Sequence, residues 1–71
     1  MNEFIPVVIH SHVHYNYLKF SPIDTEFEQS MVRASVRIGG KSELISILFG
    51  NEEFTARRWK NGKELKMFLI L

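Results

Sequence analysis

Apolar and polar residues alternate along much of this 71-residue chain, and this period of two restricts its fold more than any other feature. Side chains of a β-strand point alternately to opposite faces, so an alternating segment forms a strand with one buried and one solvated face. Residues 9–17 and residues 32–38 both follow this pattern, and we expect a strand in each. Pro6 cannot donate a ladder hydrogen bond, so the first strand either starts at a sheet edge or begins just after Pro6.

The pair Asn61-Gly62 lies between two further alternating segments and is typical of a two-residue type I′ hairpin turn. This turn fixes the register of the two strands and sets Arg57 directly opposite Lys66. Like charges in opposed positions cost up to about 1 kcal/mol unless an anion lies beside them. The face expected to form the core carries Phe54, Ala56, Leu65, Met67 and Leu69. The other face carries Arg57, Trp59, Lys66, Phe68 and Ile70.

The middle of the chain contains signals for a short helix and for a turn. Residues 21–24 (Ser-Pro-Ile-Asp) have the spacing of a capping box with proline at the first helical position. They predict a helix near 22–30, with an acidic loop as the alternative. Gly39-Gly40 follows the second alternating segment and predicts a tight hairpin turn. Residues 44–49 are mostly apolar on both faces, which indicates that 43–49 form a central strand or, alternatively, a short helix.

Length and composition select among the folds that these segments allow. A chain of 71 residues forms one domain, 1–71, and its hydrophobic fraction of 45% is too high for a disordered segment. Without cysteine there is no disulfide framework to supplement a small core. We therefore expect a mostly β fold: a small antiparallel barrel or curled sheet of five to six short strands, with at most one short helix near 22–30.

Several classes of function lack their sequence signals. The chain has no thiol nucleophile, and its serines and histidines show neither the elbow motif nor the triad spacing of hydrolases. Its acidic start and the short apolar run at 4–9 differ from a signal peptide, and no segment approaches the ~20 apolar residues of a membrane span. We expect a non-enzymatic, cytoplasmic protein with no cofactor and no membrane partner.

Basic residues gather near the C-terminal turn and provide the leading hypothesis for function. Five of the nine Lys and Arg residues fall between positions 57 and 66, around the single tryptophan. Cations neutralise phosphates and an exposed indole stacks on a base, so such a hairpin predicts nucleic-acid binding. The expected contacts are Arg57, Arg58, Trp59, Lys60, Lys63 and Lys66, extended by Arg33 and Arg37. The alternative is a solvated edge, at which the cations prevent edge-to-edge aggregation and Trp59 covers the core.

The C-terminal residues support a second hypothesis, a protein-binding module. Residues 67–71 are apolar on both faces, and one thin sheet cannot bury large apolar groups on both sides. Phe68 and Ile70 therefore require a second layer or a second subunit, and we expect the chain to self-associate. With Met67 they form the expected interface of a homo-oligomer, or of a small inhibitor or adaptor similar in size to phage-encoded inhibitors and antitoxin-like regulators.

Three histidines at alternate positions, His10, His12 and His14, support a third hypothesis. Imidazoles at positions i and i+2 of a strand point the same way, about 7 Å apart, so two of them could bind one metal ion. A third ligand would have to come from another segment, and no acidic residue is singled out by its spacing. The alternative is that the histidines occupy the solvated face of an amphipathic strand.

Overall fold

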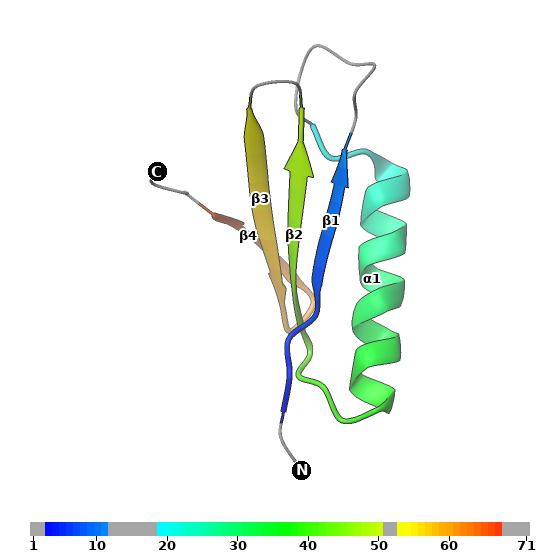
Figure 1. Cartoon of the computed structure of the whole chain (residues 1–71). Helices are drawn as coiled ribbons and strands as arrows, with labels where there is room; N and C mark the ends of the chain where they lie inside the picture. Colours follow the sequence, from blue (N-terminus) through cyan, green and yellow to red (C-terminus); the bar gives the residue numbers. More distant parts are fainter. Residues whose placement is uncertain (1–2, 12–18, 51–52, 68–71) are drawn as a thin grey trace.

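The computed structural model describes residues 3–11, 19–50 and 53–67, and in these residues the chain forms a four-stranded sheet with one helix against one of its faces (Figure 1). The elements are β1 (Val7–Ser11), α1 (Pro22–Arg37), β2 (Glu43–Phe49), β3 (Phe54–Lys60) and β4 (Lys63–Met67). The strand order is β1-β2-β3-β4. β1 runs parallel to β2, whereas β2–β3 and β3–β4 are antiparallel. The helix is the crossover that a parallel neighbouring pair requires.

The expected fold class is confirmed only in its coarse form, as mostly sheet. The described residues hold four strands rather than five or six, the sheet is mixed rather than antiparallel, and it does not close into a barrel. The strand predicted over 32–38 is wrong, because these positions belong to α1 and to its C-terminal cap. The predicted strand over 9–17 overlaps β1, and positions 12–18 lie outside the described residues.

Local sequence signals explain where α1 starts and why it extends beyond the predicted 22–30. At its start the Ser21 hydroxyl accepts a hydrogen bond from the Asp24 amide (3.1 Å), and the Asp24 carboxylate accepts one from the Ser21 amide (2.7 Å). This is the capping box that the sequence predicted. No breaking residue follows until Gly39, so the helix continues for 16 residues. The alternation over 32–38 is therefore not a strand signal.

Gly39 and Gly40 end the helix instead of forming the predicted hairpin. Gly39 has a φ of 98°, in the left-handed region that favours glycine. Its amide donates to the Val36 carbonyl (3.2 Å), and the Gly40 amide donates to the Ser35 carbonyl (2.8 Å). These two bonds are the Schellman arrangement, which satisfies helix carbonyls that have no partner within the helix.

The other turn prediction is confirmed. Asn61 and Gly62 have φ values of 51° and 83°, as a type I′ turn requires. Lys60 pairs with Lys63 and Arg57 with Lys66, in the predicted register. Residues 43–49 form a strand, as the first of the two alternatives predicted.

The two faces of the sheet differ in what covers them. Side chains facing α1 include His10, Leu44, Ser46, Leu48, Arg57 and Trp59. The opposite face carries Val7, Ile9, Ile45, Ile47, Phe49, Phe54, Ala56, Leu65 and Met67. The helix thus covers the hairpin face that we did not assign to the core. Leu65, assigned to the core, is 46% exposed.

The apolar core of the described residues is small. Its buried hydrophobic members are Leu44, Leu48, Ala56 and Trp59. Among the same residues, no helix has both the length and the apolar character to cross a membrane.

Candidate functional site

A fully buried carboxylate, that of Glu28, lies between α1 and the sheet and organises the interior. Glu28 is 0% exposed. Its Oε1 accepts hydrogen bonds from Arg57 Nε (2.9 Å) and Trp59 Nε1 (2.9 Å), and its Oε2 accepts one from Arg57 Nη2 (3.1 Å). A buried carboxylate is tolerated only when its charge and its lone pairs are matched in this way.

The positions of these residues along their elements bring them together. Asp24 and Glu28 are four residues apart on α1 and therefore share one helical face. Arg57 and Trp59 are two residues apart on β3 and therefore share one sheet face. The helix turns its polar face inward, and on its outer surface Ile23 is 77% exposed.

His10 of β1 connects the same interior to a second carboxylate. Its Nδ1 lies 3.2 Å from Asp24 Oδ1, and its Nε2 is hydrogen-bonded to Ser46 Oγ at 3.1 Å. Asp24, His10 and Ser46 thus follow the order of a Ser-His-Asp relay. Ser46 is 0% exposed, so no substrate can reach its hydroxyl in this conformation. The arrangement holds β1, β2 and α1 together.

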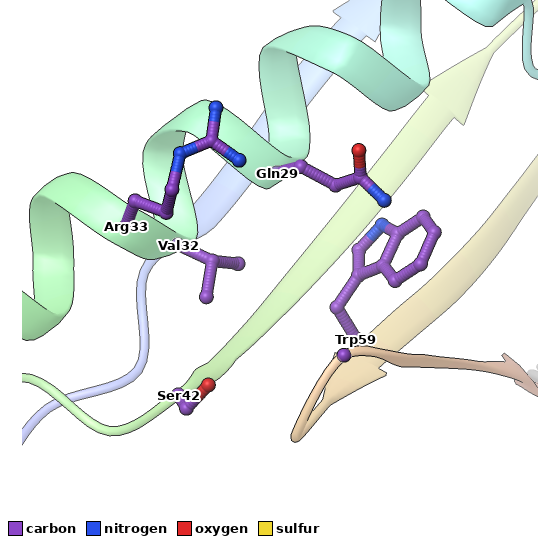
Figure 2. Close-up of a pocket in the computed structure, with 6 residues that line it drawn as sticks. Gln29, Val32, Arg33, Ser42 and Trp59 are labelled. Carbon is purple, nitrogen blue, oxygen red and sulfur yellow. The ribbon is translucent and has the colours of Figure 1, made fainter.

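A pocket of about 310 Å³ opens between α1 and the turn that joins β3 to β4 (Figure 2). It is lined by Gln29, Val32, Arg33, Ser42, Trp59 and Gly62. Gln29 and Val32 project from the helix towards the indole of Trp59, as Figure 2 shows. Arg33, which is exposed, and Gly62 of the hairpin turn thus line the same pocket.

Exposed cations lie on the last turns of α1 and beside the hairpin turn. Lys60 and Lys63 flank the Asn61-Gly62 turn, and Arg37 is the last residue of α1. We call Arg33, Arg37, Lys60 and Lys63 the basic end; all four are exposed. They come from two segments that are distant in the sequence, and Arg33 and Gly62 of these segments line the same pocket. The C-terminal end of α1 and the β3–β4 turn lie towards the same end of the molecule (Figure 1).

Two other cations near this end are paired with carboxylates. Lys41 Nζ lies 3.5 Å from Glu3 Oε2. Arg58 Nη2 donates to Glu43 on the neighbouring strand. This hydrogen bond, together with the charges of Arg58 and nearby lysines, holds the pKa of the Glu43 carboxyl below its ordinary value of 4.5.

The structure separates the residues that the sequence grouped as nucleic-acid contacts. Arg57 is 5% exposed and Trp59 is 7% exposed, so both lie inside the domain rather than on its surface. Lys66 is exposed further along β4, away from the turn. Glu28 supplies an anion beside Arg57, one member of the like-charge pair. Sequence reasoning missed Glu28, although its spacing from Asp24 was a visible signal.

The remaining predicted sites stay predictions. Met67 is half-buried at the end of β4, and Phe68 and Ile70 lie outside the described residues. His12 and His14 also lie outside them, whereas His10 faces the helix. Within residues 3–11, 19–50 and 53–67 there is no group of three His, Cys, Asp or Glu side chains placed to hold a metal ion.

Comparison with known proteins leaves the function to be argued from the chain itself. Neither the protein-family models, nor the curated proteins, nor the solved structures contain a match to this sequence or fold. The buried network explains how α1 is held on the sheet. The basic end and the pocket beside it lie outside that network and form the candidate binding site.

Proposed function

We propose that this protein binds the phosphate backbone of a nucleic acid at its basic end. The observation that supports this best is that Arg33 and Gly62 line the same pocket, with Lys60 and Lys63 flanking the turn that contains Gly62. A cation of the helix and the turn between two lysines thus border one pocket. A polyanion is the ligand that such a set of exposed, separately anchored cations suits.

The burial of Trp59 changes the mode of binding from the one the sequence suggested. Its indole N–H donates to Glu28, and only 7% of the residue is exposed. A base cannot stack on a ring held in this way without disrupting the interior. The proposed binding is therefore electrostatic and independent of base sequence, as phosphate contacts are.

The size of the salt dependence follows from the number of cations. Each phosphate contact contributes about −0.7 for single strands, or about −0.9 for duplexes, to the slope of log K against log salt. The four cations of the basic end therefore give a slope of about −3. Arg57 and Arg58 add little, because Glu28 and Glu43 already pair with them.

The test is a titration of fluorescently labelled, mixed-sequence oligonucleotides, single-stranded and duplex, at several salt concentrations. Arg33→Ala and Lys63→Ala should each weaken binding and make the slope shallower by about 0.7 to 0.9. Lys19→Ala is the matched control, because Lys19 is an exposed lysine ahead of the opposite end of α1. It should leave both quantities unchanged.

Two results would contradict the proposal. One is the absence of binding at low salt, where even weak phosphate contacts are detectable. The other is an equal loss of affinity in Lys19→Ala and Lys63→Ala, because binding would then follow net charge rather than the basic end.

A further inference from the structure

The pocket between α1 and the β3–β4 turn has the size of a site for one nucleobase. Its volume is about 310 Å³. A cavity of about 150 Å³ holds a benzene-sized ring, so this pocket has room for the fused rings of a purine or the smaller ring of a pyrimidine. Pockets for small ligands begin at about 300 Å³, so a longer stretch of nucleic acid does not fit inside it.

The walls of the pocket are held in place by contacts of the fold itself. Trp59 is fixed by the hydrogen bond from its Nε1 to Glu28 Oε1 (2.9 Å). Ser42 is joined to the hairpin turn, because its carbonyl accepts a hydrogen bond from the Asn61 amide (2.9 Å). Val32 is half-buried and projects from α1 towards the indole (Figure 2). The pocket therefore exists before a ligand binds, which lowers the entropic cost of binding.

Two neutral polar side chains line the pocket and can form hydrogen bonds with a base. The carboxamide of Gln29 and the hydroxyl of Ser42 each act both as donor and as acceptor. In the described part of the chain, neither group is hydrogen-bonded to another residue. Every base carries polar groups on its edges that such side chains can match. The two side chains can therefore hold a base without selecting one, in agreement with binding that is independent of base sequence.

We propose that this pocket takes up one unpaired base of a single-stranded nucleic acid, while the cations of the basic end bind the phosphates beside it. This inference rests on the function proposed above and specifies its ligand. Bases of a duplex are paired and stacked, whereas the unpaired bases of a single strand can be splayed out into a protein site. Because Trp59 is only 7% exposed, the base lies beside the indole and does not stack over it.

The positions of the cations favour a strand over a free nucleotide. Arg33 lines the pocket itself and can bind the phosphate next to the base. Lys60 and Lys63 flank the turn and are not among the residues that line the pocket. They require phosphates further along a chain, which a mononucleotide does not supply. The ligand that uses all of these cations is therefore a strand.

The experiment is a titration of the full chain at low salt, which measures affinity with labelled strands and observes the pocket through the fluorescence of Trp59, the single tryptophan. The probes are a mixed-sequence DNA single strand and an abasic strand of the same length and charge. The strand with bases should bind about 5-fold or more tightly than the abasic strand, and it alone should change the Trp59 emission. Nucleoside monophosphates at the same nucleotide concentration should change the emission far less.

Substitutions in the pocket separate the base from the phosphates. Val32→Phe fills the pocket without changing charge, so it should reduce the affinity for the single strand to that for the abasic strand. Val36→Phe is the matched control, because Val36 lies on the same helix, is 47% exposed and does not line the pocket. It should leave both affinities unchanged.

If Val32→Phe does not fold, Gln29→Ala takes its place, since Gln29 is exposed and its loss leaves the packing intact. This variant should weaken binding of the single strand but not of the abasic strand. Ser30→Ala, at the next exposed position of α1, should change neither affinity.

Each outcome decides the inference. Equal affinities for the two strands, or an unchanged Trp59 emission, overturn the base pocket but leave phosphate binding at the basic end in place. If neither strand binds at low salt, the proposed function fails and this inference fails with it. Monophosphates that change the emission as strongly as the strand would show that the ligand is a free nucleotide. Equal losses in Val32→Phe and Val36→Phe would also overturn the inference, because the loss would then not come from the pocket.

Discussion

Separating the buried charge pair of Glu28 and Arg57 should unfold this protein, and removing both charges should restore its fold. Glu28→Gln keeps the shape of the side chain and an acceptor for the Trp59 N–H, but leaves the guanidinium of Arg57 at 5% exposure. The nearest other carboxylate oxygen described, Glu64 Oε1, is 3.6 Å from Arg57 Nη1. Leaving one member of a buried pair alone costs about 3 to 5 kcal/mol in the free energy of unfolding.

Arg57→Met leaves the opposite defect. The carboxylate of Glu28 is 0% exposed and would keep the Trp59 hydrogen bond but lose both bonds from the guanidinium. We expect a similar cost of about 3 to 5 kcal/mol. The double variant contains no buried charge at this pair and should lose no more than about 2 kcal/mol. The coupling between the two positions is then at least about 4 kcal/mol.

The assay is urea unfolding at one fixed protein concentration, followed by circular dichroism and by the fluorescence of Trp59. Domains of this size have a total stability of about 3 to 5 kcal/mol, so each single variant should be largely unfolded in buffer and the double variant folded. Single variants that lose less than about 1 kcal/mol, or losses that simply add in the double variant, would refute the reasoning. Either result would mean that Glu28 and Arg57 do not meet in the interior.

Two further predictions concern the ends of β2 and α1. Gly40→Ala should lower stability by about 1 to 3 kcal/mol in thermal unfolding, because its Cβ would lie 2.1 Å from Ser35 Oγ. At Gly62 a Cβ meets nothing within 4 Å, so Gly62→Ala should lower stability only by the roughly 1 kcal/mol that its positive φ costs. If the two variants lost the same stability, the close packing at Gly40 would be contradicted. The pKa of Glu43 is lowered by its bond to Arg58, so this pair stabilises the fold above pH 4.5 and loses its effect as the pH falls through the lowered pKa. The melting temperatures of the wild type and Glu43→Gln should therefore converge as the pH falls below 4.5, and a difference that does not change with pH would contradict the pairing.

The parts of the fold that the sequence predicted are those encoded by a few adjacent residues. Asn61-Gly62 specifies a turn whose required φ values other residues rarely adopt, and the turn alone then sets the register of β3 and β4. The capping box at Ser21 and Asp24 likewise needs only a spacing of three residues. Both signals act before any tertiary contact forms.

The parts that the sequence did not predict depend on contacts between distant segments. The hairpin register shows which residues share a face, but it does not show which face α1 will cover. That choice depends on Glu28, 29 residues away from Arg57 in the chain. The alternation over 32–38 predicts a strand, and this prediction is wrong. Apolar residues at every second position can also lie on a helix whose inward face is polar. Ser35 is buried there, whereas Val36 is 47% exposed.

The candidate site was predicted in its charge but not in its geometry. The excess of cations near positions 57–66 was visible, and so was the unfavourable pairing of Arg57 with Lys66 across the hairpin. Composition could not show that Arg57 and Trp59 turn inward while Lys60 and Lys63 stay exposed. Nor could it show that Arg33, which the sequence predicted to lie on a strand, belongs to a helix. There it lines the same pocket as Gly62 of the hairpin turn.

The most direct test of the proposed function is the salt dependence of nucleic-acid binding by the wild type and by the Arg33→Ala/Lys63→Ala variant. These substitutions remove one cation from the helix and one from the hairpin. We predict that the slope of log K against log salt changes from about −3 in the wild type to about −1.5 in the variant. A wild-type slope near zero, or the same slope in both proteins, would contradict a phosphate-binding site at the basic end.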